Sequence, residues 1–348
     1  MRPKYVELAE SLRRLLNSLL EAESISASIE ARAKTLGSFA EKVARDGKSY
    51  TDPLAQITDL CGLRIIVLTL DDVSLVERII RREMIVDEEN SISKGASFEM
   101  DRFGYKSVHL VAQIGRSRKD LAEWRDACEL KAEIQIRTIG QHAWAAAEHA
   151  LAYKTEIDVP LELRRRLFRL SALFELADQE IGDISRQSAR ILSAYRAQIN
   201  KQDTILELNV ESLRAYIECS PTVETYVKVI RDLNVNVTGP GALSRDVTMA
   251  TMAGVNTIGD LDHLFIKAKD WLSNVISSYI ANCKTENLSG IDAPMSVDLN
   301  GIVTIVLIAS FGETFTQKAL ESDLGFGLAW RVIEPARTFN PRYLKSAL

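Results

Sequence analysis

The sequence predicts an α+β protein in which a β-sheet carries helices on its faces. Apolar and polar side chains alternate within residues 130–137 and again within 105–114, the pattern of a strand with one buried face. The short apolar run at 65–68 is typical of a strand covered on both faces. Leucines at helical spacing within residues 5–20 predict a helix beside this sheet.

The remaining elements of the N-terminal half follow from the same periodicities. We expect helices at 5–20, 25–45, 71–83, 139–153 and 160–200, a loop at 47–53 and a polar, mixed segment at 86–103. Asp71 or Asp72 is expected near the start of its helix. Residues 160–200 form one long helix or two, with these apolar positions facing the core: Leu167, Leu170, Leu173, Phe174 and Leu176.

The C-terminal part has a different pattern and predicts a second α+β domain. Helices are expected at 205–232 and 261–282, and a loop or short helix at 233–260. Residues 295–310 are expected to form a strand, a turn at Asn300-Gly301 and a second strand, because Asn-Gly is a typical hairpin turn. A further strand is expected at 326–334.

Length and composition limit the number of domains and the class of protein. A chain of 348 residues is long for one domain, so we expect two, at 1–200 and 201–348. No apolar run reaches the roughly 18–20 residues of a membrane span, and no signal peptide is expected. The four cysteines form no metal-like pair and are expected as free thiols in a reducing cytoplasm. A net charge of −5 argues against a generally basic surface that binds nucleic acid, and no DNA partner is expected.

The polar face of the predicted strand at 130–137 is the first candidate site. Glu133, Gln135 and Arg137 alternate there, just before a strongly helical segment. An acid, an amide and a guanidinium on one face suit a cleft that handles metal and phosphate. A solvated strand face shows the same pattern.

Three segments in this order resemble the nucleotide pyrophosphokinase (synthetase) domain of the RelA/SpoT family, over roughly residues 25–200. They are Asp59-Leu-Cys-Gly-Leu-Arg-Ile65, Gly104-Tyr-Lys-Ser-Val-His109 and Glu133-Ile-Gln-Ile-Arg-Thr138. The resemblance implies a nucleotidyltransferase-like synthetase fold, a mixed sheet flanked by helices with the active cleft over one sheet face. It also implies transfer of pyrophosphate from ATP.

For the metal, the resemblance implies that Asp59 and Glu133 bind Mg²⁺ and are the catalytic acids, and it makes the glutamate a candidate base for the attacking hydroxyl. Mg²⁺ is held by one or two carboxylates together with phosphate oxygens and water. The alternatives are an ion pair of Asp59 with Arg64 and a solvated position for Glu133.

On the donor side, Lys34, Ser38 and Lys42 recur at i, i+4 and i+8 and are expected along one helix face, where they can hold the β- and γ-phosphates of ATP. Taken alone, this stripe is also typical of a solvated face. The resemblance places Arg32 on the adenine side, where its plane can stack on the base.

On the acceptor side, Tyr105, Ser107 and His109 share a face if the segment is extended. The resemblance implies that Tyr105 stacks on the acceptor base and that His109 lies near the acceptor phosphates, with Gln135 and Arg137 on the same side. Arg137 is either a phosphate contact or the ion-pair partner of a site carboxylate. The alternative is that Tyr105 is a core residue and that His109 is a strand histidine whose hydrogen bonds are all made within the protein.

The acceptor loop departs from the family pattern. Phe103 stands where guanine-nucleotide synthetases carry an amide, and Asp101 where they carry a lysine. This departure resembles the toxic small synthetases, some of which move pyrophosphate onto the 3′ end of tRNA. A basic cluster is either a solvated helix face or an RNA contact: Arg164, Arg165, Arg166 and Arg169.

Three hypotheses follow. The first is an alarmone synthetase that modifies the 3′-hydroxyl of GTP or GDP. The second is a toxin of the same fold that modifies tRNA. The third is a nucleotide sensor without catalysis. The domain at 201–348 is expected to inhibit the first domain, to bind a trigger or to build a homo-oligomer.

Overall fold

The computed structural model describes residues 2–45, 50–92, 107–150, 161–201, 205–285, 295–311, 315 and 330–340. The chain divides into two compact units, Met1–Arg186 and Gln187–Leu348. One helix, α6 (Leu161–Asn200), contributes its first part to unit 1 and its last part to unit 2, so the range 160–200 forms a single helix.

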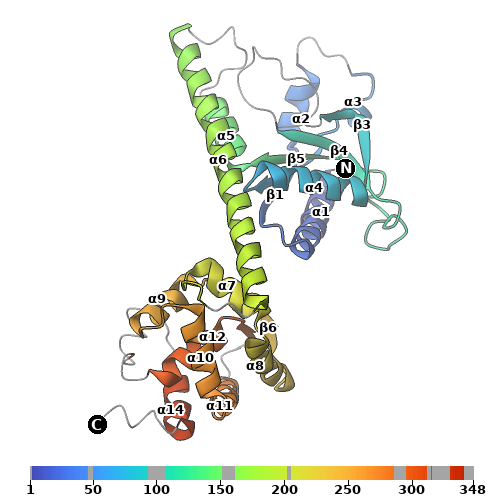
Figure 1. The fold of residues 1–348 in the computed structure, drawn as a ribbon. Coiled ribbons are helices and arrows are strands. Elements are labelled where there is room, and N and C mark those ends of the chain that lie inside the picture. Colours follow the sequence, from blue (N-terminus) through green and yellow to red (C-terminus); the bar gives the residue numbers. More distant parts are fainter. Residues whose placement is uncertain are drawn as a thin grey trace. The chain divides into compact units, whose positions relative to one another are not determined.

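Unit 1 is a five-stranded sheet with helices on its faces (Figure 1). Its strands are β1 (Ala27–Ala33), β2 (Cys61–Val67), β3 (Met84–Ile92), β4 (Val108–Ile114) and β5 (Ala132–Thr138). Its helices before α6 are α1 (Arg2–Ala22), α2 (Leu36–Val43), α3 (Pro53–Gln56), α4 (Leu70–Glu83) and α5 (Ile139–Ala150).

The sheet is mixed, as predicted. Its order is β1-β2-β5-β4-β3, with β2 parallel to β5 and the other neighbours antiparallel. Burial alternates strictly along β2 and β5, so each presents one apolar and one polar face. Leu63 and Ile65 of β2, Leu110 of β4 and Ile134 of β5 lie almost completely buried on the apolar face.

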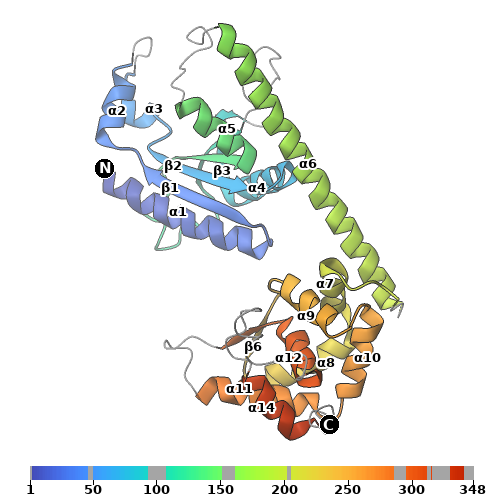
Figure 2. The ribbon, with the colours of Figure 1, turned by 90° about the vertical axis from the view of Figure 1, so that its left-hand side faces the viewer.

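Helices α1 and α4 cover the apolar face. Leu8, Leu12 and Leu16 of α1 belong to the same hydrophobic cluster as Val76 and Ile80 of α4. Figures 1 and 2 show these helices under one face of the sheet, with α2 and α5 toward the other. The polar face of β5 is therefore not covered by α1 or α4.

Helix α4 begins one residue earlier than the acids suggest. Thr69 is its N-cap, and Asp72 completes a reciprocal capping box with it. Two backbone donors at the helix start are thereby satisfied, which fixes the turn between β2 and α4. Asp71 and Asp72 both lie in the first turn, as predicted.

The helix predicted at 25–45 is wrong. Residues Ala27–Ala33 form β1, and only Leu36–Val43 are helical. The alanines favour a helix, but alternating burial in β1 and its full ladder with β2 determine the structure. The segment at 86–103 is also more regular than expected up to Ile92, because β3 pairs there with β4.

The prediction that α6 buries its apolar positions near its start is wrong for three of them. Leu173 and Leu176 are 62% and 53% exposed, and Leu170 is exposed as well. Phe174 packs against Trp144 of α5 with ring centroids 6.4 Å apart. The face of α6 toward α5 thus carries Phe174, whereas Leu173 and Leu176 lie at exposed positions.

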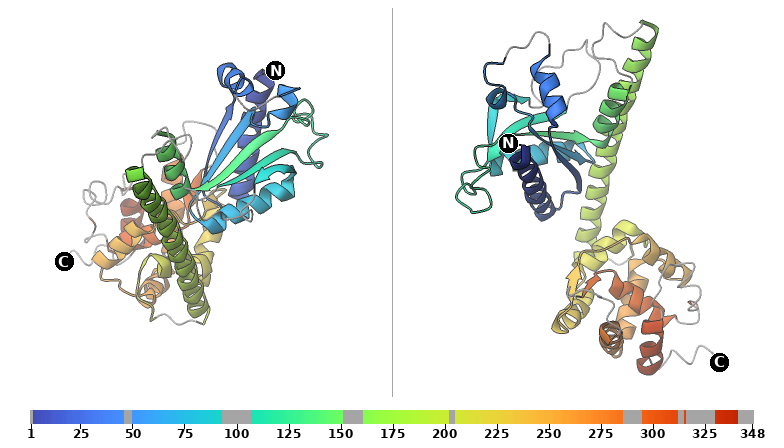
Figure 3. Two further views of the ribbon diagram at one scale, coloured as in Figure 1. Left: turned by 90° about the horizontal axis from the view of Figure 1, so that it is seen from above. Right: turned by 180° about the vertical axis from the view of Figure 1, so that it is seen from behind.

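Unit 2 is mainly helical in its described part (Figure 3). Its helices after α6 are α7 (Val210–Cys219), α8 (Pro221–Asp232), α9 (Ser244–Met252), α10 (Ile258–Ala268), α11 (Leu272–Thr285), α12 (Gly301–Ser310) and α14 (Trp330–Phe339). Strands β6 (Asn236–Thr238) and β7 (Ser296–Asp298) form a small parallel sheet. The α+β class predicted for this part is confirmed, and so are the helices expected at 205–232 and 261–282.

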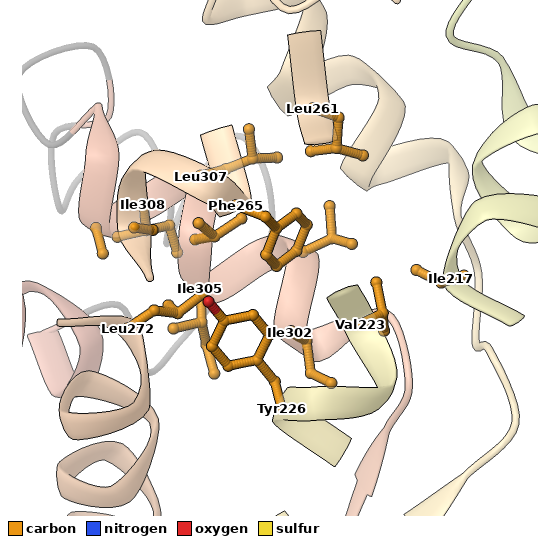
Figure 4. Packing of buried hydrophobic residues seen from close by; sticks show 14 of the residues in the cluster. Ile217, Val223, Tyr226, Leu261, Phe265, Leu272, Ile302, Ile305, Leu307 and Ile308 are labelled. Carbon is orange, nitrogen blue, oxygen red and sulfur yellow. The ribbon is translucent and has the colours of Figure 1, made fainter. Parts of the chain in front are cut away.

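The core of unit 2 surrounds α12. Every residue from Ile302 to Ala309 is buried, and Figure 4 shows Ile302, Ile305 and Leu307 among side chains from neighbouring helices such as Phe265. The second strand of the hairpin predicted at 295–310 is therefore wrong, while the first strand exists as β7. An unbroken apolar run fits a buried helix as well as a buried strand, and here packing on all sides selects the helix.

Asn300 lies in a turn, as predicted, but this turn leads from β7 into α12, and the Asn300 side chain has a structural role as well. Its amide donates to Asp246 Oδ2 at 2.7 Å, and its carbonyl oxygen accepts from the backbone of Gly241 at 2.9 Å. Thr304 donates to the other oxygen of the buried Asp246. Burial raises the pKa of Asp246, which the Thr304 and Asn300 hydrogen bonds oppose.

The strand predicted at 326–334 is wrong from Trp330 onward, where α14 begins; residues 326–329 lie outside the described residues. The four cysteines are free thiols, as predicted. In the part of the chain that the structure describes, no helix is long and apolar enough to cross a membrane.

Candidate active site

The polar face of the sheet brings the candidate residues into two neighbouring rows. In one row Arg32 of β1 pairs with Gly62 of β2, which pairs with Glu133 of β5. Residues paired across strands share a face, so Arg32 and Glu133 lie on the same side, separated by a residue with no side chain. Arg32 is thus placed by a strand, and the helix assumed for it is absent.

In the next row Arg64 pairs with Gln135, which pairs in turn with His109 of β4. Arg64 donates to Glu30 at 2.8 Å. The sequence alternative in which Arg64 neutralises Asp59 is therefore wrong, because Asp59 pairs with other cations.

Asp59 lies just before β2 and accepts from two lysines. Its Oδ2 is 2.6 Å from Lys34 Nζ and 2.9 Å from Lys42 Nζ. Lys34 follows the last residue of β1, and its backbone N–H donates to the carbonyl oxygen of Leu60, the residue just before β2, so this bond continues the ladder between the two strands. Lys42 comes from α2, one turn beyond Ser38.

The single helix face predicted for the donor group is therefore wrong for Lys34, which lies outside α2. Thr35 caps this helix through Ser38 N, and its hydroxyl donates to Ser38 Oγ at 3.0 Å. The two lysines still converge on one point, but that point is Asp59.

Burial and the neighbouring lysines act in opposite directions on the pKa of Asp59. Burial alone raises its pKa, but hydrogen bonds and charges from Lys34 and Lys42 outweigh burial, and the net pKa is lowered. Its Oδ1 atom is buried and has no hydrogen-bond partner within the described residues. An ionised carboxylate with one unused oxygen is an available ligand.

Glu133 is held by its neighbours on the sheet face. Gln135 Nε2 donates to its Oε1 at 2.9 Å, and His109 Nδ1 lies 3.4 Å from the same atom. The interaction with His109 lowers the pKa of Glu133, burial raises it, and Gln135 lowers it further, for a net lowering. The charge of Asp59 raises the pKa of Glu133, so the two acids are close enough to interact.

Arg137 lies at the end of this row. It donates to Gln135 Oε1 at 2.6 Å, which turns the amide so that its nitrogen faces Glu133. Ser107 Oγ is 2.8 Å from His109 Nε2. The structure therefore brings together Ser107, His109, Gln135 and Arg137 with Glu133, and both predictions for Arg137 stay open.

Several predicted residues lie outside this description. Asp101, Phe103 and Tyr105 are not among the described residues, nor is the side chain of Arg164. Arg165, Arg166 and Arg169 are exposed on α6.

Sequence reasoning named Arg32 but missed the strand β1 that carries it, and it missed Glu30. Glu30 and Arg32 alternate with Ile29 and Ala31, and this period of two was a signal for a strand. Gly62 was also missed as the open position between Arg32 and Glu133.

Two nearby carboxylates, one with a free buried oxygen, fit a divalent cation that takes its remaining ligands from phosphate and water. Within the described ranges, no group of three or more His, Cys, Asp or Glu side chains forms a metal site. The donor set therefore fits Mg²⁺ shared with a polyphosphate better than a metal held by protein alone, and the lysines beside it suit the phosphates.

Comparison with known proteins agrees with this kind of site. Residues 31–158 match the family described as "Region found in RelA / SpoT proteins". The chain is 31% identical over 189 residues to GTP pyrophosphokinase YjbM of Bacillus subtilis (strain 168), covering 52% of this chain and 83% of that protein. It is 28% identical over 162 residues to GTP pyrophosphokinase YwaC of the same organism, covering 45% and 73%.

Among solved structures, the small alarmone synthetase 1 from Bacillus subtilis is similar with a TM-score of 0.43 and 26% identity, covering 54% of this chain and 95% of that one. The sequence match to YjbM carries the assignment. The chain belongs to the RelA/SpoT family.

Proposed function

We propose that this chain is a pyrophosphokinase that transfers the β,γ-pyrophosphate of ATP to the 3′-hydroxyl of GTP or GDP. The observation that carries the proposal is the convergence of Lys34 and Lys42 on Asp59, near Glu133 on the polar sheet face. Similarity to two proteins named GTP pyrophosphokinases supports a guanine nucleotide as acceptor.

The donor side follows from the lysines. In the absence of nucleotide the single charge of Asp59 balances only one of their two charges. The β- and γ-phosphates of ATP offer more negative charge and more acceptor oxygens than one carboxylate, so the lysines transfer to them. Arg32, on the same face as Glu133, would then stack on the adenine.

Release of Asp59 from the lysines makes its oxygens available. Asp59 and Glu133 would hold Mg²⁺, which neutralises phosphate charge and orients the polyphosphate when bound. The chain's own contribution is a pair of carboxylates for the cation and a pair of lysines for the phosphates, all close together in the fold.

In the transfer, one bond to phosphorus forms and one breaks. The 3′-oxygen of the acceptor attacks the β-phosphorus of ATP, the bond from that phosphorus to the α,β-bridging oxygen breaks, and AMP leaves. The hydroxyl proton passes to a base, for which Glu133 is the candidate because its lowered pKa keeps it ionised and it lies on the polar face of β5. Positioning and charge stabilisation supply most of the rate in such reactions.

The test offers acceptors side by side. Purified protein is incubated with γ-labelled ATP and Mg²⁺ in the presence of GTP, GDP or bulk tRNA, with Glu133→Gln as the matched inactive control. Label on GTP or GDP that depends on Glu133 is the expected result. Label confined to inorganic phosphate would contradict the proposal.

A second candidate acceptor is the 3′ end of tRNA. The exposed arginines of α6, Arg165, Arg166 and Arg169, favour it because such a cluster suits an RNA backbone. The sequence departures at Phe103 and Asp101 favour it as well. Label on tRNA in the same assay, with none on guanine nucleotides, would select this acceptor.

A further inference from the structure

The unit 1 part of helix α6 (Figure 1) has a buried side and, opposite to it, a band of exposed side chains. Ser171, Asp178 and Gly182 are buried and mark the first side, where Asp178 accepts from Thr138. An α-helix turns by about 100° per residue, so the opposite side carries a set of six residues. All six are exposed: Arg166, Arg169, Leu173, Leu176, Glu180 and Asp183.

The spacing within this band is that of a coiled coil. Its members are alternately three and four positions apart, which is the a and d pattern of two paired helices. Along about 26 Å of helix the band carries two arginines, then two leucines, then two acids. Reversing the band end to end places the arginines on the acids and the leucines on each other. The band is therefore complementary to a copy of itself that runs in the opposite direction.

We propose that α6 pairs with α6 of a second copy of this chain as an antiparallel two-stranded coiled coil. In such a pair each a residue faces a d residue of the other helix, so Leu173 faces Leu176 of the second copy. By the same register Arg169 faces Glu180, and Arg166 faces Asp183. Two-fold symmetry repeats each contact, so two central leucine layers lie between four layers of opposite charge.

The charges favour the antiparallel over the parallel arrangement. In a parallel pair a faces a and d faces d, so Arg169 would meet Arg169 and Glu180 would meet Glu180. Like charges placed opposite each other oppose binding, whereas the antiparallel register gives each arginine an acid. The long stems of arginine and glutamate also cover apolar surface beside the leucines.

Two further apolar side chains widen the contact. Leu170 and Ile184 each follow a d residue, and both are exposed, Ile184 by 65%. In the antiparallel pair these positions lie along one edge, with Leu170 of each copy beside Ile184 of the other. The contact forms only when two copies meet, so it depends on concentration, and a dilute single copy keeps Leu173 exposed.

Charge reversal tests the pairing without changing the leucines. Asp183 also accepts from Arg186 of the same helix, so the reversals are made at Arg169 and Glu180. Arg169→Glu sets acid against acid, and Glu180→Arg sets arginine against arginine. In a dilution series by analytical ultracentrifugation, the wild type is expected to dimerise, and each variant should raise the dissociation constant at least about tenfold. Glu175→Arg, an exposed reversal outside the band, is the matched control and should leave association unchanged.

Rescue of the two reversals by each other is specific to the antiparallel register. A variant with both Arg169→Glu and Glu180→Arg regains opposite charges in every layer and is expected to dimerise like the wild type. An equimolar mixture of the two single variants should pair for the same reason. All replaced side chains are exposed, and circular dichroism melts check that each variant is folded.

Three results would overturn the proposal. A wild type that is monomeric at the highest concentration of the series forms no such pair. A dimer that neither single reversal weakens is held by another surface. Loss of tRNA labelling in Arg169→Glu, with association unchanged and no rescue by Glu180→Arg, would assign the arginine to RNA. The association needs neither nucleotide nor acceptor, so its failure leaves the proposed function untouched.

Discussion

Thr138 donates its hydroxyl to Asp178 Oδ2 at 2.6 Å, and both side chains are buried. Thr138 is the last residue of β5, the strand that carries Glu133, and Asp178 belongs to the unit 1 part of α6. The same threonine exchanges hydrogen bonds with Gln141 in the first turn of α5. One side chain thus fixes the end of the candidate catalytic strand to two helices.

Loss of this hydroxyl should destabilise unit 1. Thr138→Val keeps the shape but leaves the buried Asp178 without its donor, so we expect a loss of about 1–3 kcal/mol in the free energy of unfolding. Asp178→Asn retains an acceptor for Thr138 and should cost less. Thr248→Val on α9 is the matched control, because Thr248 is exposed. Equal stability of Thr138→Val and wild type in denaturant titrations would show that the contact is not needed.

The lysine pair should control the ionisation of Asp59. In a Lys34→Met/Lys42→Met variant burial is no longer opposed, so the pKa of Asp59 should rise above its ordinary value of 3.8. In the wild type the lowered pKa of Asp59 stabilises the folded state at pH values above the pKa of the unfolded chain. This stabilisation is lost as the pH falls through the pKa of Asp59 in the folded state. Carboxyl ¹³C titration measures this, and a pKa that stays below 3.8 in the variant would refute the account.

The same double variant should also lose the donor nucleotide. Two cations beside the phosphates are replaced by apolar side chains, so we expect KM for ATP to rise at least tenfold while KM for the acceptor changes little. Lys4→Met on the exposed side of α1 is the control. An unchanged KM for ATP would place the donor phosphates elsewhere.

Buried and exposed leucines should respond differently to polar or smaller side chains. Leu110 is fully buried in the sheet core, so Leu110→Ala should cost about 2–5 kcal/mol. Leu173 is 62% exposed on α6, so Leu173→Gln should change stability by less than about 0.5 kcal/mol. Thermal unfolding of both variants tests whether Leu173 of α6 is exposed while Leu110 is buried. A large loss in Leu173→Gln would mean that this leucine is covered in solution.

The arginines of α6 should discriminate between acceptors. Replacing Arg165, Arg166 and Arg169 by alanine leaves the sheet face untouched, so transfer to GTP should be unchanged. If tRNA is the acceptor, its labelling should fall and become less sensitive to salt, because phosphate contacts are lost. A variant that labels tRNA as well as the wild type would leave the cluster as a solvated helix face.

The sequence predicts the sheet face of the site well because period-two alternation is a local signal. Glu133, Gln135 and Arg137 lie together as the pattern of β5 requires. The contact of Lys34 with Asp59 was beyond local reasoning, because these residues are 25 positions apart and are joined by the pairing of β1 with β2. The helix predicted at 25–45 leaves no strand at Ala27–Ala33, so the pairing of β1 with β2 does not follow from the sequence pattern.

The C-terminal unit shows a second limit. The apolar run in α12 has no period, so only the surrounding helices determine whether it is strand or helix. The dipeptide Asn300-Gly301 predicts a turn between two strands, yet a helix follows it and Asn300 donates a hydrogen bond to the buried Asp246. Such a role depends on residues 54 positions away and has no local signature.

The most direct test of the account follows the transferred group itself. ATP labelled at both the β- and γ-phosphorus is incubated with the protein and the acceptor identified above, and the product and AMP are quantified. We expect both labels to reach the acceptor together and one AMP to appear for each modified acceptor, with loss of both in Glu133→Gln. Release of ADP with only the γ-label on the acceptor would mean single phosphoryl transfer, and would contradict a pyrophosphokinase.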